Sequence, residues 1–502
     1  MTDVVLLSPP SRCVNHYRPP MALLYLAGHL QKNKISVKII DITIKDVIRD
    51  KKFFDNLPQK LNEVENEILS QIIKYKAKVV GITCYTPEYQ EVLKISKKIK
   101  KLYPRTTIVV GGIHPTLYPE ELLFEEKSPI NFEVIGEGEE TFLELCQKIL
   151  KIKNISYKNI KGIAYKKNME LIKTPLRPLN NNLDAISHPA YNLIDMDYYT
   201  QASPYSIRGC FLRSFYLLAT RGCPSTCTFC VAKKLRTYNG IGCYTRVRSA
   251  KNIIKELKVL RNKYHIDSFY FIDDLFTINK KNVAEFCRLL KHEKLYLLWG
   301  CSAKVSTLDE TTIKLMSESG CVQIDFGVER GSNKALNIVK KGISVEMVKN
   351  IFNLCHRYHI RTFANFLVNL PQETKKDLHD IINLATDLKS EIISINVFTP
   401  YPGTEIYDQM KYRFSKDEYG ELFNASILIK SKPNKYQFSK HKIDILKWAT
   451  IQNRKFNKII PNLRFHCSYK YIKTLLNSHK KHNYIIQSIN LAKEIANQKY
   501  NS

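Results

Sequence analysis

Three cysteines stand within eight residues of one another, at Cys223, Cys227 and Cys230. Thiolates are the ligands that suit zinc and iron–sulfur clusters. A structural zinc site takes four protein ligands, usually two cysteine pairs or cysteines with spaced histidines, and the sequence offers no second such pair near this one. Cys243 follows thirteen residues later, in glycine-rich surroundings typical of an ordinary turn. The spacing therefore favours a 4Fe–4S cluster in which one iron stays open for a substrate or cofactor.

The elements around these cysteines indicate how they would be positioned. From about residue 214, six apolar strands alternate with helical patterns, which predicts a partial (β/α)6 barrel of the TIM type. The cysteines follow the first strand directly, at the end of the barrel where active sites lie. The expected strands are Phe215–Ala219, Ser268–Ile272, Tyr296–Cys301, Val322–Phe326, Arg361–Val368 and Ile392–Phe398.

The first 150 residues also alternate strands with helices. Runs rich in Val and Ile, separated by helical patterns, predict a Rossmann-like, doubly wound parallel sheet. Such sheets bind ligands at the carboxyl ends of their strands, and small residues there let a ligand approach the backbone. The expected strands are Val4–Ser8, Val37–Asp41, Val79–Thr83, Thr107–Val110 and Phe132–Ile135.

The chain is thus expected to be α/β, with four parts. Residues 1–151 form the Rossmann-like sheet and residues 152–208 a linker with a small hairpin around Gly162–Tyr165. Residues 209–425 form the partial barrel, and residues 426–502 a basic helical C-terminal region. A length of 502 residues agrees with about three domains of ordinary size.

Composition narrows the class of protein. The chain carries 78 Lys and Arg against 47 Asp and Glu, a formal charge of +31, with 44% hydrophobic residues. That mixture excludes disordered, collagen-like and coiled-coil proteins. Between residues 430 and 502 there are 16 basic and 2 acidic residues, so the charge indicates either a docking tail for RNA or an anionic membrane, or the codon bias of an AT-rich genome. No signal peptide or membrane-spanning run is read, so we expect a soluble cytoplasmic protein.

The cysteine segment resembles the CxxxCxxC signature of radical S-adenosylmethionine (SAM) enzymes, including an aromatic residue before the last cysteine. Roughly residues 210–410 resemble the barrel of that family. Two departures stand out: Asn369 and Gln372 replace the usual glycines around Pro371, and Lys304 stands where Arg is common. By this resemblance the residues expected at SAM are Phe229, Asp273, Lys304, Glu329, Pro371 and Pro402.

The segments 110–116 and 136–142 resemble the cobalamin-binding domain that precedes the barrel in one large radical subclass, the class B methylases. The sheet lacks the DxHxxG motif that supplies an axial histidine in other cobalamin proteins. His114 is either a cofactor contact or a turn residue with a satisfied ring, and Gly111 and Gly112 could equally be structural. The residues expected at cobalamin are Thr83, Gly111, Gly112, His114, Gly136 and Glu137.

The resemblance implies a reaction and three cofactors, namely a 4Fe–4S cluster, SAM and cobalamin. One electron from the cluster would cleave SAM to a 5′-deoxyadenosyl radical, which abstracts hydrogen from an unactivated carbon. Methylation is the usual outcome in this subclass, and ring closure or rearrangement also occurs. A flavodoxin or ferredoxin would supply electrons. The substrate, a small molecule, lipid or peptide, is not identified by any residue.

Two alternatives stay open at this point. A tRNA methylthiotransferase would use three further cysteines for a second cluster, and Cys13, Cys84 and Cys146 are available, although not in that family's sequence contexts. A basic binding module without catalytic activity would instead use its tail to hold RNA, or would lay Phe438, Trp448 and Phe456 on an anionic membrane.

Overall fold

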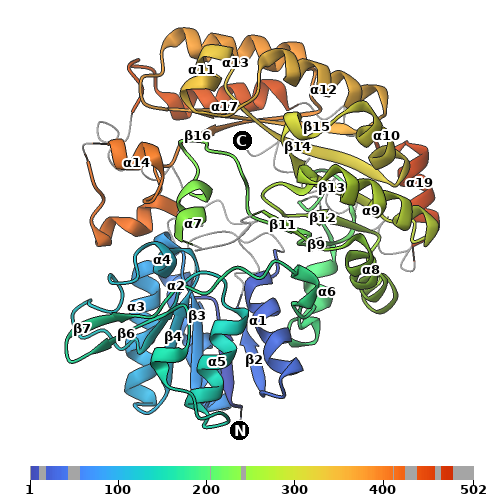
Figure 1. The fold of residues 1–502 in the computed structure, drawn as a ribbon. Helices are drawn as coiled ribbons and strands as arrows, with labels where there is room; N and C mark the ends of the chain where they lie inside the picture. The colour runs from blue at the N-terminus through green and yellow to red at the C-terminus, as the bar shows by residue number, and fades with distance from the viewer. Residues whose placement is uncertain are drawn as a thin grey trace.

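Two seven-stranded sheets, one in each half of the chain, organise the computed structural model (Figure 1). The structure describes residues 2–10, 18–42, 57–203, 205–238, 245–410, 412–423, 438–457 and 465–478. Cys13, Cys243 and much of the basic C-terminal region lie outside these residues.

The first sheet has the strand order β2-β1-β3-β4-β5-β6-β7. Its first five strands are parallel, as expected, and they are almost completely buried because helices cover both faces. The strands are β1 (Val4–Leu7), β2 (Val37–Ile40), β3 (Val79–Thr83), β4 (Thr107–Gly111) and β5 (Phe132–Val134). The helices are α1 (Met21–Lys32), α2 (Leu57–Tyr75), α3 (Tyr89–Leu102), α4 (Ile113–Leu117) and α5 (Glu139–Ile149).

The small hairpin expected in the linker is present and extends the first sheet. It consists of β6 (Ile163–Lys167) and β7 (Glu170–Lys173), and β6 pairs antiparallel with β5. The chain then passes through α6 (Met196–Thr200) and β8 (Ala202–Ser203) into the second sheet, where β8 pairs antiparallel with the first barrel strand. The hairpin is therefore part of the first sheet's edge.

The second sheet is the partial barrel, with order β16-β15-β14-β13-β12-β9-β8. Six of its strands are parallel and alternate with helices, which confirms the expected architecture. The strands are β9 (Leu212–Leu217), β12 (Ser268–Phe271), β13 (Leu298–Ala303), β14 (Cys321–Glu329), β15 (Arg361–Val368) and β16 (Ile392–Val397). The helices between them are α8 (Ala250–Tyr264), α9 (Lys280–His292), α10 (Glu310–Glu318), α11 (Asn333–Ile338), α12 (Val345–Arg357) and α13 (Lys375–Leu388).

The barrel helices start where the sequence supplies a capping side chain. At each N-cap, a side-chain oxygen accepts the backbone N–H three residues on and so satisfies a donor that has no partner within the helix. The capping residues are Ser249, Asn279, Asp309, Ser332, Ser344 and Thr374.

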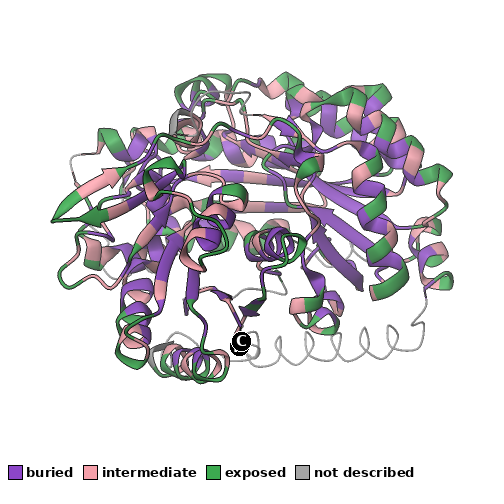
Figure 2. Ribbon diagram, turned by 60° about the horizontal axis from the view of Figure 1, so that its bottom comes forward, coloured by how far each residue is buried: buried purple, intermediate pink, exposed green. Residues whose placement is uncertain are grey.

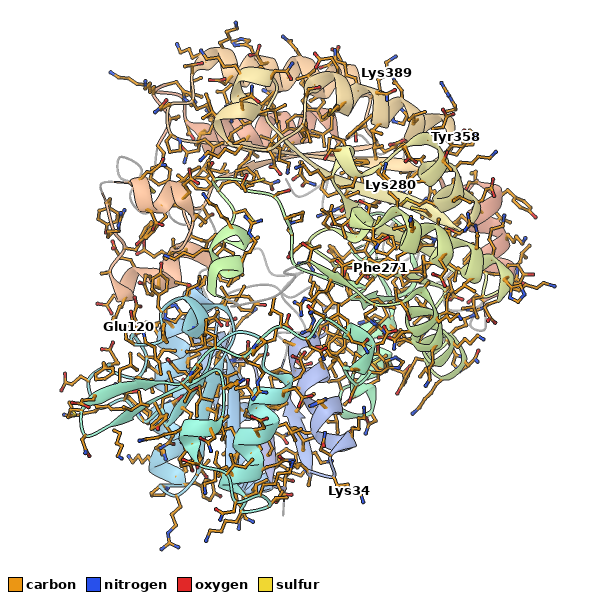
Figure 3. The ribbon with its side chains drawn as sticks, in the orientation of Figure 1. Lys34, Glu120, Phe271, Lys280, Tyr358 and Lys389 are labelled. Carbon is orange, nitrogen blue, oxygen red and sulfur yellow. The ribbon has the colours of Figure 1, made fainter. Side chains whose placement is uncertain are left out.

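An aromatic cluster fills the layer between the barrel strands and α9. Phe271 stacks on Phe276 with ring centroids 4.1 Å apart, and Phe286 and Trp299 meet Phe271 edge to face. In Figure 3, Phe271 lies in the interior, whereas Lys34 and Lys389 point outward from the rim. The parallel strands of both sheets are mostly buried, whereas the β6–β7 hairpin is partly exposed and the outer helix faces are exposed (Figure 2).

Part of the basic C-terminal region packs against the barrel strands. Helix α17 (Ile445–Phe456) lies along β16, and α19 (Tyr469–Leu476) contacts β13. Phe438, Trp448 and Phe456 are partly buried and pack against the core, so part of the apolar surface of each is covered by the protein itself. Among the described residues, no helix has the length and apolar character needed to cross a membrane.

Candidate functional site

The cysteine loop lies between the two sheets. A short antiparallel ribbon of β10 (Thr220–Arg221) and β11 (Arg246–Val247) leads into it, and α7 (Ala232–Tyr238) follows it. Helix α7 contacts α4 at the edge of the first sheet (Figure 1). Two backbone hydrogen bonds fix the loop at Thr228. Thr228 N donates to Val339 O at 3.1 Å, and Ile406 N donates to Thr228 O at 3.1 Å.

The three thiols are close enough to influence one another's ionisation. Burial raises the pKa of Cys227, and burial raises that of Cys230 to about 11; Cys223 adds to both shifts. Within the described residues no set of three or more His, Cys, Asp or Glu side chains gathers as ligands of a single ion. A 4Fe–4S cluster makes a different demand, because each cysteine binds a different iron atom and the sulfurs need not meet at one point. The donor set, three thiols on one loop, fits such a cluster.

Two lysines place positive charge beside the thiols. Lys341 Nζ lies 2.9 Å from Glu329 Oε1 and 5.8 Å from the centre of the Phe229 ring. Although burial lowers the pKa of Lys341, the Glu329 carboxylate and Cys227 raise it more, so the net shift is upward. Lys304 Nζ is 3.2 Å from Ser225 Oγ in the cysteine loop, and burial lowers its pKa. Both cations favour the thiolate form of Cys227.

Asp273 lies at the base of the loop. Its Oδ1 accepts backbone N–H bonds from Ala219, at 2.8 Å, and from Thr220. Its Oδ2 has no hydrogen-bond partner among the described residues, and the side chain is buried. Burial raises the pKa of Asp273 to about 7, against those backbone bonds. Asp273 therefore fixes the bend that starts the cysteine loop and keeps one oxygen for a further donor.

The remaining residues expected at SAM lie at neighbouring strand ends. Glu329 ends β14 with a positive φ of 69°. Pro371 follows β15 and Pro402 follows β16. Phe229 packs against a small apolar cluster that includes Leu370 and Phe398. The structure thus brings Phe229, Lys304 and Glu329 to the cysteine loop and places the two prolines on the same face of the barrel.

The residues expected at cobalamin are divided by the structure. Thr83, Gly111 and Gly136 stand at the carboxyl edge of the first sheet, and Gly136 N donates to Thr116 Oγ1 at 3.0 Å. Gly112 has a φ of 115°, and a Cβ there would lie 2.8 Å from Cys84 O, so the close passage of two turns requires this glycine. Small residues line this edge of the sheet, which suits the binding of a flat ligand.

His114 is fully buried under the same edge. Its Nδ1 lies 3.2 Å from Thr86 Oγ1, and the rings of Tyr89 and Tyr419 pack on it edge to face. Burial lowers the pKa of His114 to about 3. The neutral ring therefore packs against the two tyrosines.

Glu137 connects the edge of the first sheet to the β10–β11 ribbon. Its carboxylate receives two bonds from Arg246, at 2.5 and 3.0 Å, and lies 3.3 Å from Arg221. Glu139 holds Arg221 at 2.5 Å. Arg221 and Arg246 belong to the β10–β11 ribbon. Their ion pairs therefore hold the start of the cysteine loop against the edge of the first sheet. Glu137 acts here as an interdomain anchor.

Sequence reasoning did not identify Lys341, Arg246, Arg330 or His441. Lys341 stands twelve residues beyond Glu329, a distance at which no helical or strand spacing signals a contact. Arg246 meets Glu137 across 109 residues, and such pairs leave no local pattern.

Of the three cysteines that could bind a second cluster, two lie among the described residues, and both are buried. Cys84 and Cys146 have no exposed surface, and burial raises the pKa of each thiol. Cys13 lies outside the described residues. These surroundings favour a packing role for the two thiols.

Comparisons with known proteins agree with this geometry. Residues 10–146 match the B12 binding domain, and residues 217–385 match the radical SAM superfamily. The chain is 31% identical over 411 residues to the uncharacterized methyltransferase PH0819 of Pyrococcus horikoshii, covering 81% of this chain and 82% of that protein. It is 29% identical to the anaerobic magnesium-protoporphyrin IX monomethyl ester cyclase of Rubrivivax gelatinosus, covering 78% of this chain and 66% of the cyclase.

A solved structure shares the fold over most of the chain. It is the radical SAM methyltransferase TsrM from Kitasatospora setae, with a TM-score of 0.62 at 18% identity, covering 81% of this chain and 77% of TsrM. The cobalamin-dependent radical enzyme OxsB gives 0.61 at 18% identity, and the match covers 92% of this chain and 63% of OxsB.

The two domains and their order define a class, the radical SAM enzymes that carry a B12-binding domain ahead of the barrel. The chain belongs to this cobalamin-dependent methyltransferase and cyclase family. It is an enzyme whose cofactors are a 4Fe–4S cluster, SAM and cobalamin.

Proposed function

We propose that the protein methylates, or closes a ring at, an unactivated carbon of a small molecule. In this proposal Cys223, Cys227 and Cys230 bind the cluster, and SAM lies across the adjoining strand ends. Cobalamin lies at the carboxyl edge of the first sheet. A flavodoxin or ferredoxin is the proposed electron donor.

The observation that carries the proposal is the anchoring of the cysteine loop to the first sheet. Arg221 and Arg246 bind Glu137 and Glu139 from the ribbon that leads into the loop. These ion pairs hold the edge proposed for cobalamin against the segment that leads into the loop proposed for the cluster. A substrate between them would be within reach of both.

The cluster with SAM supplies one-electron chemistry, and cobalamin supplies methyl-transfer chemistry, when these groups are bound. The chain's own residues bind and orient. Lys341 would neutralise Glu329 and balance the charge of the thiolates, while Lys304 and Asp273 Oδ2 would contact the polar end of SAM. Phe229 and Pro371 form apolar surface for the remainder, and the buried surroundings keep water from the reacting atoms.

At the first sheet, Thr83, Gly111 and Gly136 leave room for a flat corrin ring, and Gly112 shapes the turn beside them. A protein histidine is not part of the proposed site, because the His114 ring is enclosed by Tyr89 and Tyr419. One relative is a methyltransferase by name and another a cyclase, so both outcomes stay within the proposal.

The first experiment tests the cluster and SAM. After anaerobic reconstitution, the protein should hold about four irons per chain and, once reduced, should cleave SAM to methionine and 5′-deoxyadenosine. Cys223→Ala, Cys227→Ala and Cys230→Ala should each abolish both. The exposed Cys467 supplies the control, since Cys467→Ala should preserve both. About eight irons would instead support a methylthiotransferase with two clusters.

A second experiment tests cobalamin. The purified protein, incubated with hydroxocobalamin and desalted, should retain a corrin absorption spectrum in a ratio of about one per chain. Retention of no corrin would remove methyl transfer by this route while leaving the cluster and SAM cleavage intact.

A further inference from the structure

The turn after β15 has a backbone that its residues adopt only under constraint. Asn369 has a φ of 68° and Gln372 a φ of 65°. Residues with a Cβ disfavour this left-handed region, although Asn tolerates it better than most. The turn carries Leu370 and Pro371 and leads into α13. Side-chain contacts must therefore stabilise this backbone conformation.

Glu373 supplies the inner half of that constraint. Its side chain has no exposed surface. One oxygen accepts the N–H of Asn369 at 2.9 Å, and the other accepts a bond from Arg330. Arg330 also donates to Leu367 O at 2.7 Å, so the carboxylate ties the turn to the end of its own strand.

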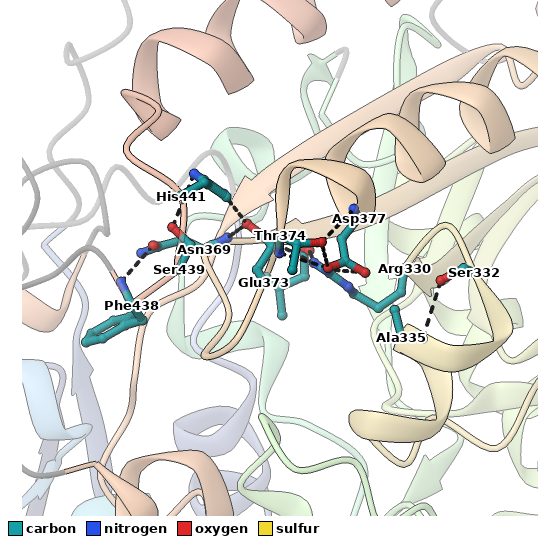
Figure 4. A network of polar contacts seen from close by, with 11 residues as sticks. Arg330, Ser332, Ala335, Asn369, Glu373, Thr374, Asp377, Phe438, Ser439 and His441 are labelled. Carbon is teal, nitrogen blue, oxygen red and sulfur yellow. Dashed lines mark hydrogen bonds and ion pairs between the residues drawn. The ribbon is translucent and has the colours of Figure 1, made fainter.

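The outer half comes from residues 438–441 of the C-terminal segment, as Figure 4 shows. His441 Nε2 lies 3.1 Å from Glu373 Oε1, and Lys440 N donates to Glu373 O at 3.0 Å. Phe438 N donates to Asn369 Oδ1, also at 3.0 Å. The segment thus contacts both ends of the turn through side chain and backbone.

The same segment reaches the cysteine loop through apolar contacts. Phe438 packs against the cluster that contains Leu370 and Phe398, with its ring 6.1 Å from that of Phe398. Phe229, the residue before Cys230, packs against this cluster too. A shift of residues 438–441 would therefore move the turn and the wall beside the cysteine loop together.

We propose that residues 438–441 form a clamp that holds the 369–373 turn in its SAM-binding conformation, with His441 as the positioning residue. The proposal rests on the proposed function, in which the turn contacts SAM. The clamp contacts the turn at two side chains, Glu373 and Asn369, and a glycine in place of Asn369 would not provide the second of these contacts.

The test compares His441→Leu with His441→Gln, whose amide can still donate to Glu373. The exposed His379, on α13 beyond the turn, supplies the control variant His379→Leu. Each reconstituted holoenzyme is assayed for SAM affinity by equilibrium dialysis, for the rate of reductive SAM cleavage at saturating SAM, and for iron content. Hydrogen exchange of the peptide that covers 367–374 is measured in parallel.

His441→Leu should weaken SAM binding about tenfold, the usual scale for loss of a buried hydrogen bond to a charged group. Turnover at saturating SAM and iron content should stay within about twofold, exchange in 367–374 should accelerate, and His441→Gln should recover most of the affinity. Unchanged SAM affinity or unchanged exchange in a folded His441→Leu protein would overturn the clamp. If the unsubstituted protein itself binds no SAM, the proposed function fails, and the clamp fails with it.

Asn369→Gly provides a second route where His441→Leu fails to fold. Glycine keeps the left-handed backbone but removes the side-chain oxygen that holds Phe438. Weaker SAM binding and faster exchange in 367–374 support the clamp, whereas affinity and exchange equal to those of the unsubstituted protein count against it.

Discussion

The side-chain amide of Asn453 binds both backbone groups of Ile395: Ile395 N donates to Oδ1 at 2.8 Å, and Nδ2 donates to Ile395 O at 2.9 Å. Asn457, one helical turn later, does the same to Ile393 at 3.1 and 2.7 Å. Strand β16 is the edge of an open barrel, and exposed edges invite pairing with other chains. Asn453 of α17 and Asn457, directly after that helix, therefore take the place of a further strand.

Removing one amide should cost stability at that edge. Asn453→Ala leaves the N–H and C=O of Ile395 without these partners, which we expect to lower the free energy of unfolding by about 1–3 kcal/mol. Urea unfolding of the apoprotein measures it, and light scattering should show increased self-association. Asn477→Ala removes a local bond to Lys473 O on an exposed helix end and should change neither. Equal stability of Asn453→Ala and the unsubstituted protein would refute the role of the amide.

Sequence alone predicts both sheets because their signals are local. Val and Ile runs mark the strands, capping residues mark the helix starts, and the cysteine spacing is contained in eight residues. The contacts that position the site are not local. Glu137 and Arg246 are 109 positions apart in the sequence. The contact of Asn453 with β16 spans 58 positions, and that of His441 with Glu373 spans 68.

His114 illustrates what a local motif does not predict. In Gly111-Gly112-Ile113-His114 the ring follows a glycine turn at a ligand-binding edge, so it invites a cofactor role. What encloses it is Tyr419, from a segment beyond the barrel, and no property of the turn predicts that. The excess of charge in the C-terminal region likewise gives no sign that α17 packs along β16.

Glu137 should contribute to stability before any cofactor binds. Arg246 is nearly buried beside it, with 4% of its side chain exposed, and Glu137→Gln leaves the Arg246 charge poorly compensated. We expect the free energy of unfolding of the apoprotein to fall by about 1–3 kcal/mol, a value below that for fully buried pairs because Glu137 is partly exposed. Urea unfolding is the measurement. Glu126→Gln, at an exposed pair with Lys127, is the control.

A different result would assign Glu137 to the cofactor. If Glu137→Gln leaves the apoprotein as stable as before yet weakens cobalamin retention, then the residue acts on the ligand and the interdomain role is wrong.

Lys341 should tune the cluster's reduction potential. Its charge interacts electrostatically with Cys227 and Cys230 and favours the added electron. Lys341→Met should therefore make the midpoint potential more negative by tens of millivolts, since a unit charge about 10 Å away contributes roughly 1–2 kcal/mol at an effective dielectric of about 20. Redox titration followed by electron paramagnetic resonance measures this shift.

The control for Lys341 is Lys340→Met. Lys340 is half exposed and pairs with Glu405, at 2.7 Å, so its removal should move the potential less. A potential that is the same in Lys341→Met and in the unsubstituted protein, at equal iron content, would show that this charge does not act on the cluster.

His114 gives the fold a defined sensitivity to acid. In the folded protein its pKa is about 3, because burial and then the charge of Lys416 lower it, whereas an unfolded histidine titrates near 6.5. Between those values the unfolded state binds more protons, so the free energy of unfolding falls as the pH decreases below about 6.5, by up to about 1.4 kcal/mol per pH unit. Glu121, 3.6 Å from Nε2, is the acidic group that faces the ring.

His114→Gln should reduce the slope of unfolding free energy against pH between pH 4 and 6 by about one proton. The exposed His379→Gln should keep the original slope. Urea unfolding across this pH range decides the matter: equal slopes for His114→Gln and the unsubstituted protein would mean that the folded state accommodates a charged His114.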